Sequence, residues 1–319
     1  MSGLIRAQVS HVSSPCRDVR YIELSARGGL PPYGPGDHID CHIEAGGRSL
    51  RRSYSLVGKW LGDGRYRIAV RLVPDSRGGS ACMATLKPGD TLSITPPRPH
   101  FPLSRLRSVH RVFLAGGIGI TPLIGMIEAV MDDDAPFDLY YAGRSAASMP
   151  FLDELAQRLG PRLHASFDDL GQRPDLAGLV RALPHDAELY VCGPIGLLNA
   201  ARQVWRDSGR DPVNLRFETF AAGGVAANSA FQVSIPRLGR ELRVNEDESL
   251  LEALERAGLE PLSNCRKGEC GLCAVEVLQL EGAIDHRDVF FSESQKAQNK
   301  LLCSCVSRLE GGRAVIDFP

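Results

Sequence analysis

Asn264-Cys265-Arg266-Lys267-Gly268-Glu269-Cys270-Gly271-Leu272-Cys273 is the stretch that decides how the C-terminal part of this chain folds. Its three cysteines have a C-x4-C-x2-C spacing, and Cys303 and Cys305 follow about thirty residues later. Close, unequal spacings let one short loop wrap around a metal centre with more than one ion. Gly268 and Gly271 allow the backbone to curl tightly, so that its N–H groups can point at sulfur atoms.

The cysteine spacing matches the pattern in which four thiolates hold a plant-type 2Fe-2S cluster. A zinc site usually needs two C-x2-4-C or H-x3-5-H pairs, and this stretch has one C-x2-C. A disulfide framework is disfavoured because nothing in the sequence indicates secretion. We therefore predict a 2Fe-2S cluster held by Cys265, Cys270 and Cys273, with zinc as the alternative. Spacing leaves Cys303 and Cys305 both open as the fourth ligand.

Length and composition indicate an ordinary globular protein with two or three domains: 319 residues, of which 43% are hydrophobic and 24% charged. A net charge of −1 gives no support for nucleic-acid binding. The chain lacks a run of 18 apolar residues and a signal-peptide pattern at its start, so we expect no membrane span. Scattered cysteines fit a reducing cytoplasm; besides those near the predicted cluster they are Cys16, Cys41, Cys82 and Cys192.

Residues 1–106 are predicted to form an antiparallel β-barrel or sandwich. Short runs with alternating apolar residues are separated by turns rich in glycine and proline, such as 31–36. The predicted strands are 5–9, 21–24, 39–43, 66–70 and 91–94.

Two motifs in this domain suggest a ligand that carries a phosphate and a flat ring. In Arg52-Ser53-Tyr54-Ser55-Leu56, strand alternation places Arg52 and Tyr54 on one face, where they can bind a phosphate and stack on an aromatic ring. In Arg77-Gly78-Gly79-Ser80, successive N–H groups can converge on an anion. Each motif alone is weak, because the first is more often an exposed strand and the second a loop.

Residues 107–222 alternate between strand and helix patterns, which predicts βαβ units and a parallel sheet. Ligands of such sheets bind beyond the carboxyl ends of the strands. The predicted strands are 109–115, 139–142, 163–166, 189–192 and 214–218, and the predicted helices are 122–131, 151–159, 176–183 and 194–207.

A glycine turn, Ala115-Gly116-Gly117-Ile118-Gly119-Ile120-Thr121-Pro122, opens the first of these helices. Free N–H groups at a helix N-terminus can bind a pyrophosphate, and Pro122 suits a first helical turn. The turn is not G-x-G-x-x-G, and the next strand ends at Gly143-Arg144-Ser145 without an acidic residue. Cys192-Gly193-Pro194 follows some 70 residues after the turn.

Residues 223–230 are small and predict a linker to a third domain, 231–319. There, a hairpin of 231–235 and 241–244 precedes a helix that starts with a capping box, Ser249-x-x-Glu252. Together with the cysteine loop and a closing strand at 314–318, this predicts a β-grasp ferredoxin fold.

The three domains and their motifs resemble the ferredoxin–NADP reductase superfamily and, in their order, the phthalate dioxygenase reductase family. The resemblance covers nearly the whole chain. It implies that R-x-Y-S binds the flavin ring and phosphate region, and that Asp75-Ser76-Arg77-Gly78-Gly79-Ser80 holds the phosphate of FMN. The flavin residues implied in this way are Arg52, Ser53, Tyr54, Ser55, Ala69, Val70, Arg71, Gly78, Gly79 and Ser80.

The same resemblance assigns the nicotinamide nucleotide to the second domain. Cys192 would lie at the nicotinamide and act in catalysis, although its residue type and position equally suit a small buried core residue. Arg144 would approach the adenosine ribose or its phosphate, and Phe220 would cover the flavin face, with Phe217 as the core alternative. The nucleotide residues implied are Gly116, Gly117, Thr121, Arg144, Cys192, Gly193 and Pro194.

The resemblance also selects a fourth cluster ligand, because in this family a C-V-S-R or C-C-S-R run carries the last one. Here that run is Cys305-Val306-Ser307-Arg308, so Cys305 is predicted as the ligand and Cys303 as a buried thiol. The two extra residues between Cys273 and Cys305 are then expected in a longer hairpin between Ala274 and Ile284. Asp285-His286-Arg287-Asp288 also matches the family, and His286 is expected to be structural, because a Rieske centre needs two histidines.

The resemblance implies an electron path from NADH through FMN and the 2Fe-2S cluster to an external acceptor. A flavin is needed between the two because a nicotinamide delivers two electrons and the cluster accepts one at a time. The acceptor implied is a Rieske-type aromatic-ring oxygenase or demethylase, and the reductase is expected to be a cytoplasmic monomer. The alternatives are a cytochrome P450 or carnitine-type oxygenase as acceptor, or a zinc-stabilised binding module. Arg144 leaves NADPH open as donor.

Overall fold

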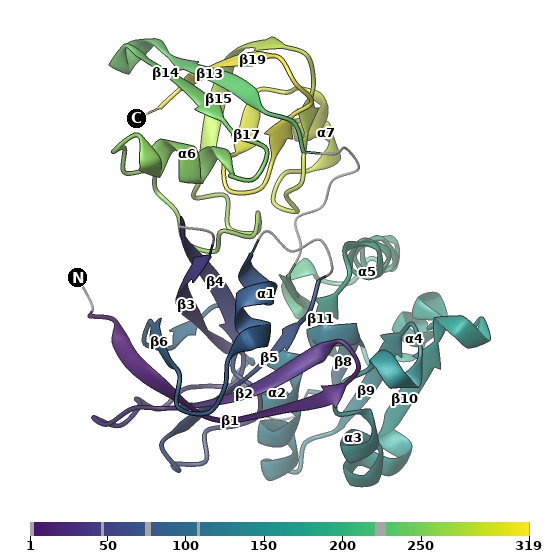
Figure 1. Ribbon diagram of the computed structural model, residues 1–319. Coiled ribbons are helices and arrows are strands. Elements are labelled where there is room, and N and C mark those ends of the chain that lie inside the picture. Colours follow the sequence, from purple (N-terminus) through teal and green to yellow (C-terminus); the bar gives the residue numbers. More distant parts are fainter. Residues whose placement is uncertain (1–2, 46–47, 74–77, 107–108, 221–227, 319) are drawn as a thin grey trace. The chain divides into compact units, whose positions relative to one another are not determined.

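The computed structural model of this protein describes residues 3–45, 48–73, 78–106, 109–220 and 228–318 (Figure 1). It divides into two compact units, Met1–Glu218 and Thr219–Pro319. The first unit holds an antiparallel sheet and a parallel sheet, and the second holds a mixed sheet. The three predicted domain folds are therefore confirmed.

The antiparallel sheet has the strand order β4-β3-β6-β1-β2-β5, and β7 pairs with β3. Its end strands meet again, because Leu56 bridges to Ile68 and Val57 N donates to Arg67 O at 2.8 Å, which closes the sheet into the predicted barrel. Alternation explains the strands; in β5, for example, Tyr66, Ile68 and Val70 are buried in one core cluster. The strands are β1 (Ile5–Cys16), β2 (Val19–Ser25), β3 (Asp37–Ala45), β4 (Arg48–Ser55), β5 (Arg65–Arg71), β6 (Thr91–Ile94) and β7 (Arg98–Pro99).

One helix in the barrel domain, α1 (Gly79–Thr85), was not predicted from the sequence. This helix has seven residues, and only Gly79 and Met83 are buried. Two buried positions do not form the apolar repeat by which a helix is recognised in a sequence. Gly78 precedes it with a φ of 95°, a left-handed conformation that favours glycine.

The parallel sheet has the strand order β10-β9-β8-β11-β12, so β8 and β11 flank the point where the chain reverses direction across the sheet. Right-handed crossovers place α2 and α3 on one face and α4 and α5 on the other (Figure 1). The strands are β8 (Arg111–Gly116), β9 (Phe137–Gly143), β10 (Leu163–Phe167), β11 (Glu188–Gly193) and β12 (Leu215–Thr219). The helices are α2 (Ile120–Asp132), α3 (Leu152–Leu159), α4 (Leu176–Ala182) and α5 (Ile195–Asp207).

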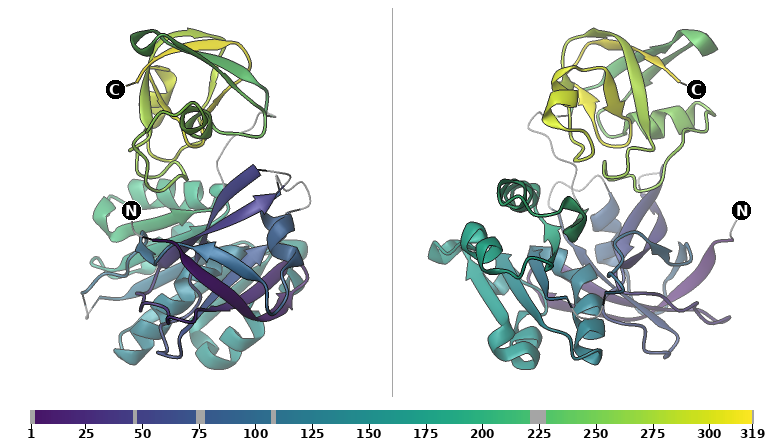
Figure 2. Two further views of the ribbon diagram at one scale, coloured as in Figure 1. Left: turned by 60° about the vertical axis from the view of Figure 1, so that its left-hand side comes forward. Right: turned by 180° about the vertical axis from the view of Figure 1, so that it is seen from behind.

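The second unit contains a mixed sheet with the strand order β14-β13-β19-β15-β17, and a small sheet in which β16 pairs with β18. Helix α6 (Leu250–Arg256) packs on the mixed sheet through Leu250, Ala253 and Leu254 (Figure 2). The predicted capping box is confirmed, because Glu252 N donates to Ser249 Oγ at 3.1 Å and Ser249 N to Glu252 Oε2 at 2.8 Å. The other elements are β13 (Phe231–Ile235), β14 (Arg240–Val244), β15 (Ala274–Glu281), β16 (Ile284–Asp285), α7 (Glu293–Ala297), β17 (Leu301–Cys303), β18 (Arg308–Leu309) and β19 (Arg313–Asp317).

The hairpin predicted between Ala274 and Ile284 is wrong. Strand β15 pairs with β17 and β19, whereas β16 pairs with β18 through Ile284 and Leu309. Ile284 and Leu309 are buried in the same core as Val275 and Val277 of β15, so Ile284 reaches this core by pairing with β18 instead of folding back on β15. The register of β15 against β19 shifts between Val277 and Gln279, which is where this strand accommodates an irregularity.

Within the described part of the chain, no helix has both the length and the apolar character needed to cross a membrane.

Candidate functional site

Strand β4 and the start of α1 meet, which brings the two predicted flavin motifs together. Arg52 lies so close to Gly79 that a Cβ on this glycine would be 2.8 Å from Arg52 Nε and 3.3 Å from its Cδ. Only a residue without a side chain leaves this space for the arginine. Ser80 Oγ, in the same motif, accepts a hydrogen bond from Val73 N at 3.2 Å. Asp75, Ser76 and Arg77 lie outside the described residues.

The opposite face of β4 is tied to a buried carboxylate. Ser53 Oγ donates to Asp40 Oδ1 at 2.5 Å, and the guanidinium groups of Arg51 and Arg98 lie 3.5 and 3.4 Å from Asp40 Oδ2. Burial acts to raise the pKa of Asp40, but the hydrogen bond from Ser53 and the charges of Arg51, His38 and Arg98 outweigh it, so the pKa lies below its ordinary value. The Ser53 hydroxyl therefore donates its hydrogen bond within the protein, to Asp40.

Ser55, at the end of the R-x-Y-S motif, contacts a residue that the sequence interpretation missed. Its Oγ donates to Glu218 Oε2 at 3.2 Å, and Glu218 is completely buried at the end of β12. Strand β12 also contains Arg216 and Thr219, so a charged residue in it gave no sequence signal of burial. Tyr54 is half-buried against the barrel core, and burial raises the pKa of its hydroxyl well above the ordinary value, which keeps it protonated.

Strand β5 brings the barrel next to the glycine turn of the second sheet. Residues 117–119 form one turn of 3-10 helix that lies against β5. Of the three β5 residues predicted at the flavin, Ala69 and Val70 are buried and Arg71 is exposed. Ala69 shares a core cluster with Ile120 and Cys192 of the nucleotide domain. The predicted flavin and nucleotide residues thus border one region of the first unit.

The carboxyl ends of β8 and β11 approach each other so closely that only glycines fit. Cys192 pairs with Ala115, and a Cβ on Gly116 would lie 2.4 Å from Pro194 Cδ. A Cβ on Gly193 would lie 2.9 Å from Gly116 Cα. These glycines therefore serve backbone packing at the reversal point of the sheet, which is where nucleotides bind in this class of fold.

Replacing Gly119 with alanine is expected to destabilise this packing. The new Cβ would lie 2.1 Å from the Cys192 carbonyl oxygen, a backbone atom that cannot rotate away. Overpacking of this kind costs about 1–3 kcal/mol, so urea denaturation should show a lower midpoint. Gly196→Ala is the matched control, because a Cβ there meets open space in α5 and is expected to leave stability unchanged or raise it slightly. Equal midpoints for G119A and wild type would contradict the proposed packing role.

Thr121 and Gly117, two residues predicted to bind the nucleotide, make hydrogen bonds within the protein. Thr121 is buried and its Oγ1 donates to Ile118 O at 3.0 Å, and Tyr141 Oη donates towards Gly117 O at 3.1 Å. Gly117 has a φ of 53°, and a Cβ on it would meet open space, so its surroundings leave room on that side. Arg144, just after β9, is exposed, and its carbonyl oxygen accepts from Asp169 N at 2.9 Å.

Cys192 is predicted at the nicotinamide and Phe220 on the flavin face, and the two side chains differ in solvent exposure. Cys192 is completely buried in the core of the first unit, as its alternative interpretation expected. Phe220 is 36% exposed and begins the second unit, where Lys267 Nζ lies 5.3 Å from its ring centroid. Phe217, the alternative to Phe220, is half-buried in β12 beneath the guanidinium of Arg202 at 5.2 Å.

The cysteine loop has the tight curl that its sequence indicated. Arg266, Gly268 and Gly271 all have positive φ values, of 53°, 75° and 72°. The N–H groups of Lys267 and Glu269 both donate to Cys265 Sγ at 3.4 Å. A hydrogen bond with Cys305 and these backbone donors lower the pKa of Cys265 to about 4, which favours the thiolate form that binds metal.

Cys303 and Cys305, the two cysteines that follow the loop in the sequence, have different positions beside it. Cys305 Sγ is 3.1 Å from Cys273 Sγ, and Cys265 is close enough to affect the pKa of Cys305, so Cys305 lies near both arms of the loop. Cys303 is fully buried at the end of β17, where it pairs with Ala274. Hydrogen bonds with Cys303 and Cys305 lower the pKa of Cys273 to about 3. Cys270 is half-buried, and burial raises the pKa of its thiol. All nine cysteines are free.

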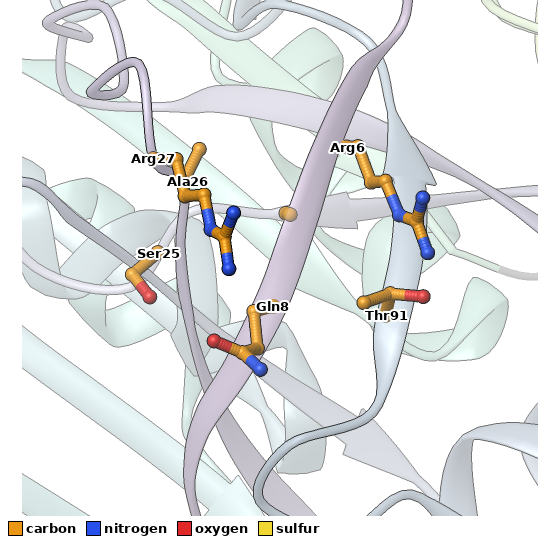
Figure 3. Close-up of a pocket in the computed structure, with 7 residues that line it drawn as sticks. Arg6, Gln8, Ser25, Ala26, Arg27 and Thr91 are labelled. Carbon is orange, nitrogen blue, oxygen red and sulfur yellow. The ribbon is translucent and has the colours of Figure 1, made fainter.

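Two surface hollows lie away from these residues. The first, of about 450 Å³, is on the barrel between β1, β2 and β6, with Arg6 and Arg27 on opposite sides of β1 (Figure 3). The second, of about 480 Å³, lies between α4 and α5. Neither contains a residue predicted to bind flavin, nucleotide or metal.

Three family models match the chain in the order of its three sheets. An oxidoreductase FAD-binding domain covers residues 7–102, an oxidoreductase NAD-binding domain covers 113–169, and a 2Fe-2S iron-sulfur cluster binding domain covers 234–310. Each match contains the motif that was assigned to that ligand: R-x-Y-S, the glycine turn and the cysteine loop.

Known proteins resemble the whole chain. It is 37% identical to the heme-dependent oxidative N-demethylase beta subunit of Ectopseudomonas mendocina (strain ymp), covering 100% of both chains. It is also 37% identical to the phenoxybenzoate dioxygenase subunit beta of Ectopseudomonas oleovorans, over 93% of this chain and 91% of that one. The structure of phthalate dioxygenase reductase superposes with a TM-score of 0.84 at 28% identity, covering 99% of this chain and 98% of the other.

A flavin-binding barrel, a nicotinamide-nucleotide sheet and a 2Fe-2S domain together define an NAD(P)H-dependent flavin oxidoreductase with an iron–sulfur centre. The chain belongs to the phthalate dioxygenase reductase family, which confirms the resemblance drawn from its motifs.

Proposed function

We propose that this chain is the NADH-dependent reductase of an oxygenase system, and that it passes electrons from NADH through FMN and a 2Fe-2S cluster to a Rieske-type oxygenase or demethylase. The observation that carries this proposal is the set of buried cysteine thiols, joined in one chain to a flavin- and nucleotide-binding unit. The proposed ligands are Cys265, Cys270, Cys273 and Cys305. Cys305 is preferred over Cys303 because it faces both Cys265 and Cys273.

The flavin assignment rests on Arg52 and Gly79. A guanidinium beside a glycine turn can donate charge-assisted hydrogen bonds to a terminal phosphate, the group with which FMN ends. The matching family model describes an FAD-binding domain, so the released flavin must be identified by mass. Tyr54, with its hydroxyl protonated, would supply an aromatic surface for the ring, and Ser55 with Glu218 would border it.

The nucleotide would bind where β8 and β11 end. Gly117 offers an open side, and the turn that contains it lies against β5 of the barrel, so a nicotinamide bound there would approach the flavin. When bound, the flavin takes up a hydride and releases single electrons. The protein's part is to align the two rings and exclude water, with Cys192 at the nicotinamide and Phe220 on the flavin face. Arg144 would contact the adenosine ribose.

Anaerobic titration of the purified protein with NADH tests the electron path. Absorbance of both the flavin and the cluster is expected to bleach, and the reduced cluster should give an EPR signal. NADPH in a parallel titration is expected to act far more slowly, with kcat/KM as the measure of preference. A protein without iron and acid-labile sulfide, or a cluster that NADH leaves oxidised, would refute the proposed function.

A haem protein is the second candidate acceptor. The name of one full-length relative describes a heme-dependent demethylase, whereas that of another describes a dioxygenase, so family membership leaves the acceptor open. Reduction of a purified Rieske oxygenase and of a haem demethylase by the same reductase, compared by rate, distinguishes the two. The five cysteines outside the proposed ligand set are free thiols, which supports the further proposal that the reductase works in the cytoplasm.

A further inference from the structure

Asp288, between β16 and α7, has a buried carboxylate that no part of the electron path described above uses. It is only 3% exposed. Its Oδ2 accepts from Phe291 N at 2.9 Å, and its Oδ1 accepts from Ser307 Oγ at 3.1 Å. Ser307 is two residues beyond Cys305, and Ser307 N donates to Cys303 O at 3.0 Å. The carboxylate is therefore attached to the segment that carries the late cysteines.

The backbone at Asp288 contacts the cysteine loop as well. Val289 N donates to Gly268 O at 3.0 Å, and a Cβ on Gly268 would lie 2.9 Å from Asp288 Cα. One residue thus joins the loop of the first three cysteines to the segment that contains Cys305. Both contacts therefore help to hold the two ligand-bearing segments together.

Among the described residues, a backbone N–H, a serine hydroxyl and a histidine surround the carboxylate oxygens, and no arginine or lysine pairs with them. Burial acts to raise the pKa of Asp288, but the neighbouring His286, the hydrogen bonds from Phe291 N and Ser307 Oγ and the charge of Lys296 outweigh it, and the pKa is lowered. Lys296 Nζ donates to the carbonyl oxygen of Asp288 at 2.8 Å, and His286 Nδ1 lies 3.7 Å from Oδ1.

We propose that Asp288 is a positioning residue that holds the cysteine loop against the Cys305 segment and, through its buried negative charge, keeps the reduction potential of the cluster low. The proposal rests on the cluster ligands given under the proposed function. Reduction adds one negative charge to the cluster, so a fixed negative charge nearby opposes it. Because Asp288 is buried, salt and water screen this repulsion only weakly.

Asp288→Asn in the full-length holoprotein tests the effect of the charge, because asparagine has nearly the same shape and keeps one acceptor oxygen. The cluster content and the EPR signal of the reduced cluster are expected to remain, while the midpoint potential becomes less negative. The ratio of reduced to oxidised cluster at a fixed applied potential should rise about three- to tenfold. Glu310→Gln is the matched control: its side chain is exposed and belongs to the same unit, so the potential should not change.

Two further variants complete the test. Ser307→Ala removes a hydrogen bond but keeps the charge, so the potential should stay near that of wild type. If D288N fails to retain iron, Lys296→Met tests the charge instead, because it removes a cation beside Asp288 and should make the potential more negative. An unchanged potential in a cluster-containing D288N, or in K296M, overturns the proposal. A wild-type protein without a cluster would refute the proposed function instead.

Discussion

Cys305→Ala is expected to abolish assembly of the 2Fe-2S cluster, whereas Cys303→Ala is expected to keep it. Cys305 Sγ lies 3.1 Å from Cys273 Sγ and also contacts Cys265, so it can complete a four-thiolate site. Cys303 sits in the core at the end of β17, where its neighbour in the loop is Cys273. Iron and acid-labile sulfide per chain, with the visible and EPR spectra, measure the difference.

Loss of the cluster in C305A should remove NADH-driven reduction of cytochrome c while leaving bound flavin and its reduction by NADH intact. This outcome separates a ligand effect from general unfolding, because the predicted flavin and nucleotide residues other than Phe220 lie in the first unit. C303A removes a buried sulfur and is expected to cost about 1–2 kcal/mol of stability without loss of iron. The reverse result, with iron lost from C303A and kept in C305A, would assign the fourth ligand to Cys303.

Arg52→Ala is expected to weaken flavin binding by roughly ten- to a hundredfold. A charge-assisted hydrogen bond to a phosphate contributes about 1.5–3 kcal/mol, and Arg52 is the side chain that packs onto Gly79 in the predicted phosphate site. The measurement is the dissociation constant of FMN from the stripped protein, followed by flavin fluorescence. Flavin released from wild type and identified by mass settles FMN against FAD.

Arg65→Ala is the control for that experiment. Arg65 lies on β5 of the same barrel, but it is exposed and paired with Glu23 at 2.8 Å, so its removal should leave flavin affinity unchanged. Full flavin occupancy in R52A, or equal weakening in R65A, would show that Arg52 does not bind the phosphate. Thermal unfolding of both variants without flavin shows whether either change acts through stability.

Much of this fold could be predicted because its signals are local. The alternation in β1 to β6 and the longer periods of α2 to α5 are properties of contiguous residues, and the predicted elements of the parallel sheet match the observed ones within about two residues at each end. The capping box at Ser249 is equally local. Helix α1 was missed because only two of its residues face a core.

The candidate site was predicted less completely, because its contacts join distant parts of the chain. The C-x4-C-x2-C spacing indicates a cluster, but the spacing alone could not choose between Cys303 and Cys305. The contact of Ser55 with Glu218 spans 163 residues, and neither residue signals the other. The role of Asp288 likewise depends on Gly268 and Ser307, which approach it from two different segments.

The amino-acid sequence thus established the three kinds of domain and their order and predicted a chemistry for each motif, because strand and helix periods and cysteine spacing are read from neighbouring residues. Folding in three dimensions decided which motifs meet: Arg52 with Gly79, the end of β8 with that of β11, and Cys305 with Cys273. It also paired β16 with β18 in place of the expected hairpin. These outcomes follow from strand register and from which side chains share a core, and both are set by packing among residues far apart in the chain.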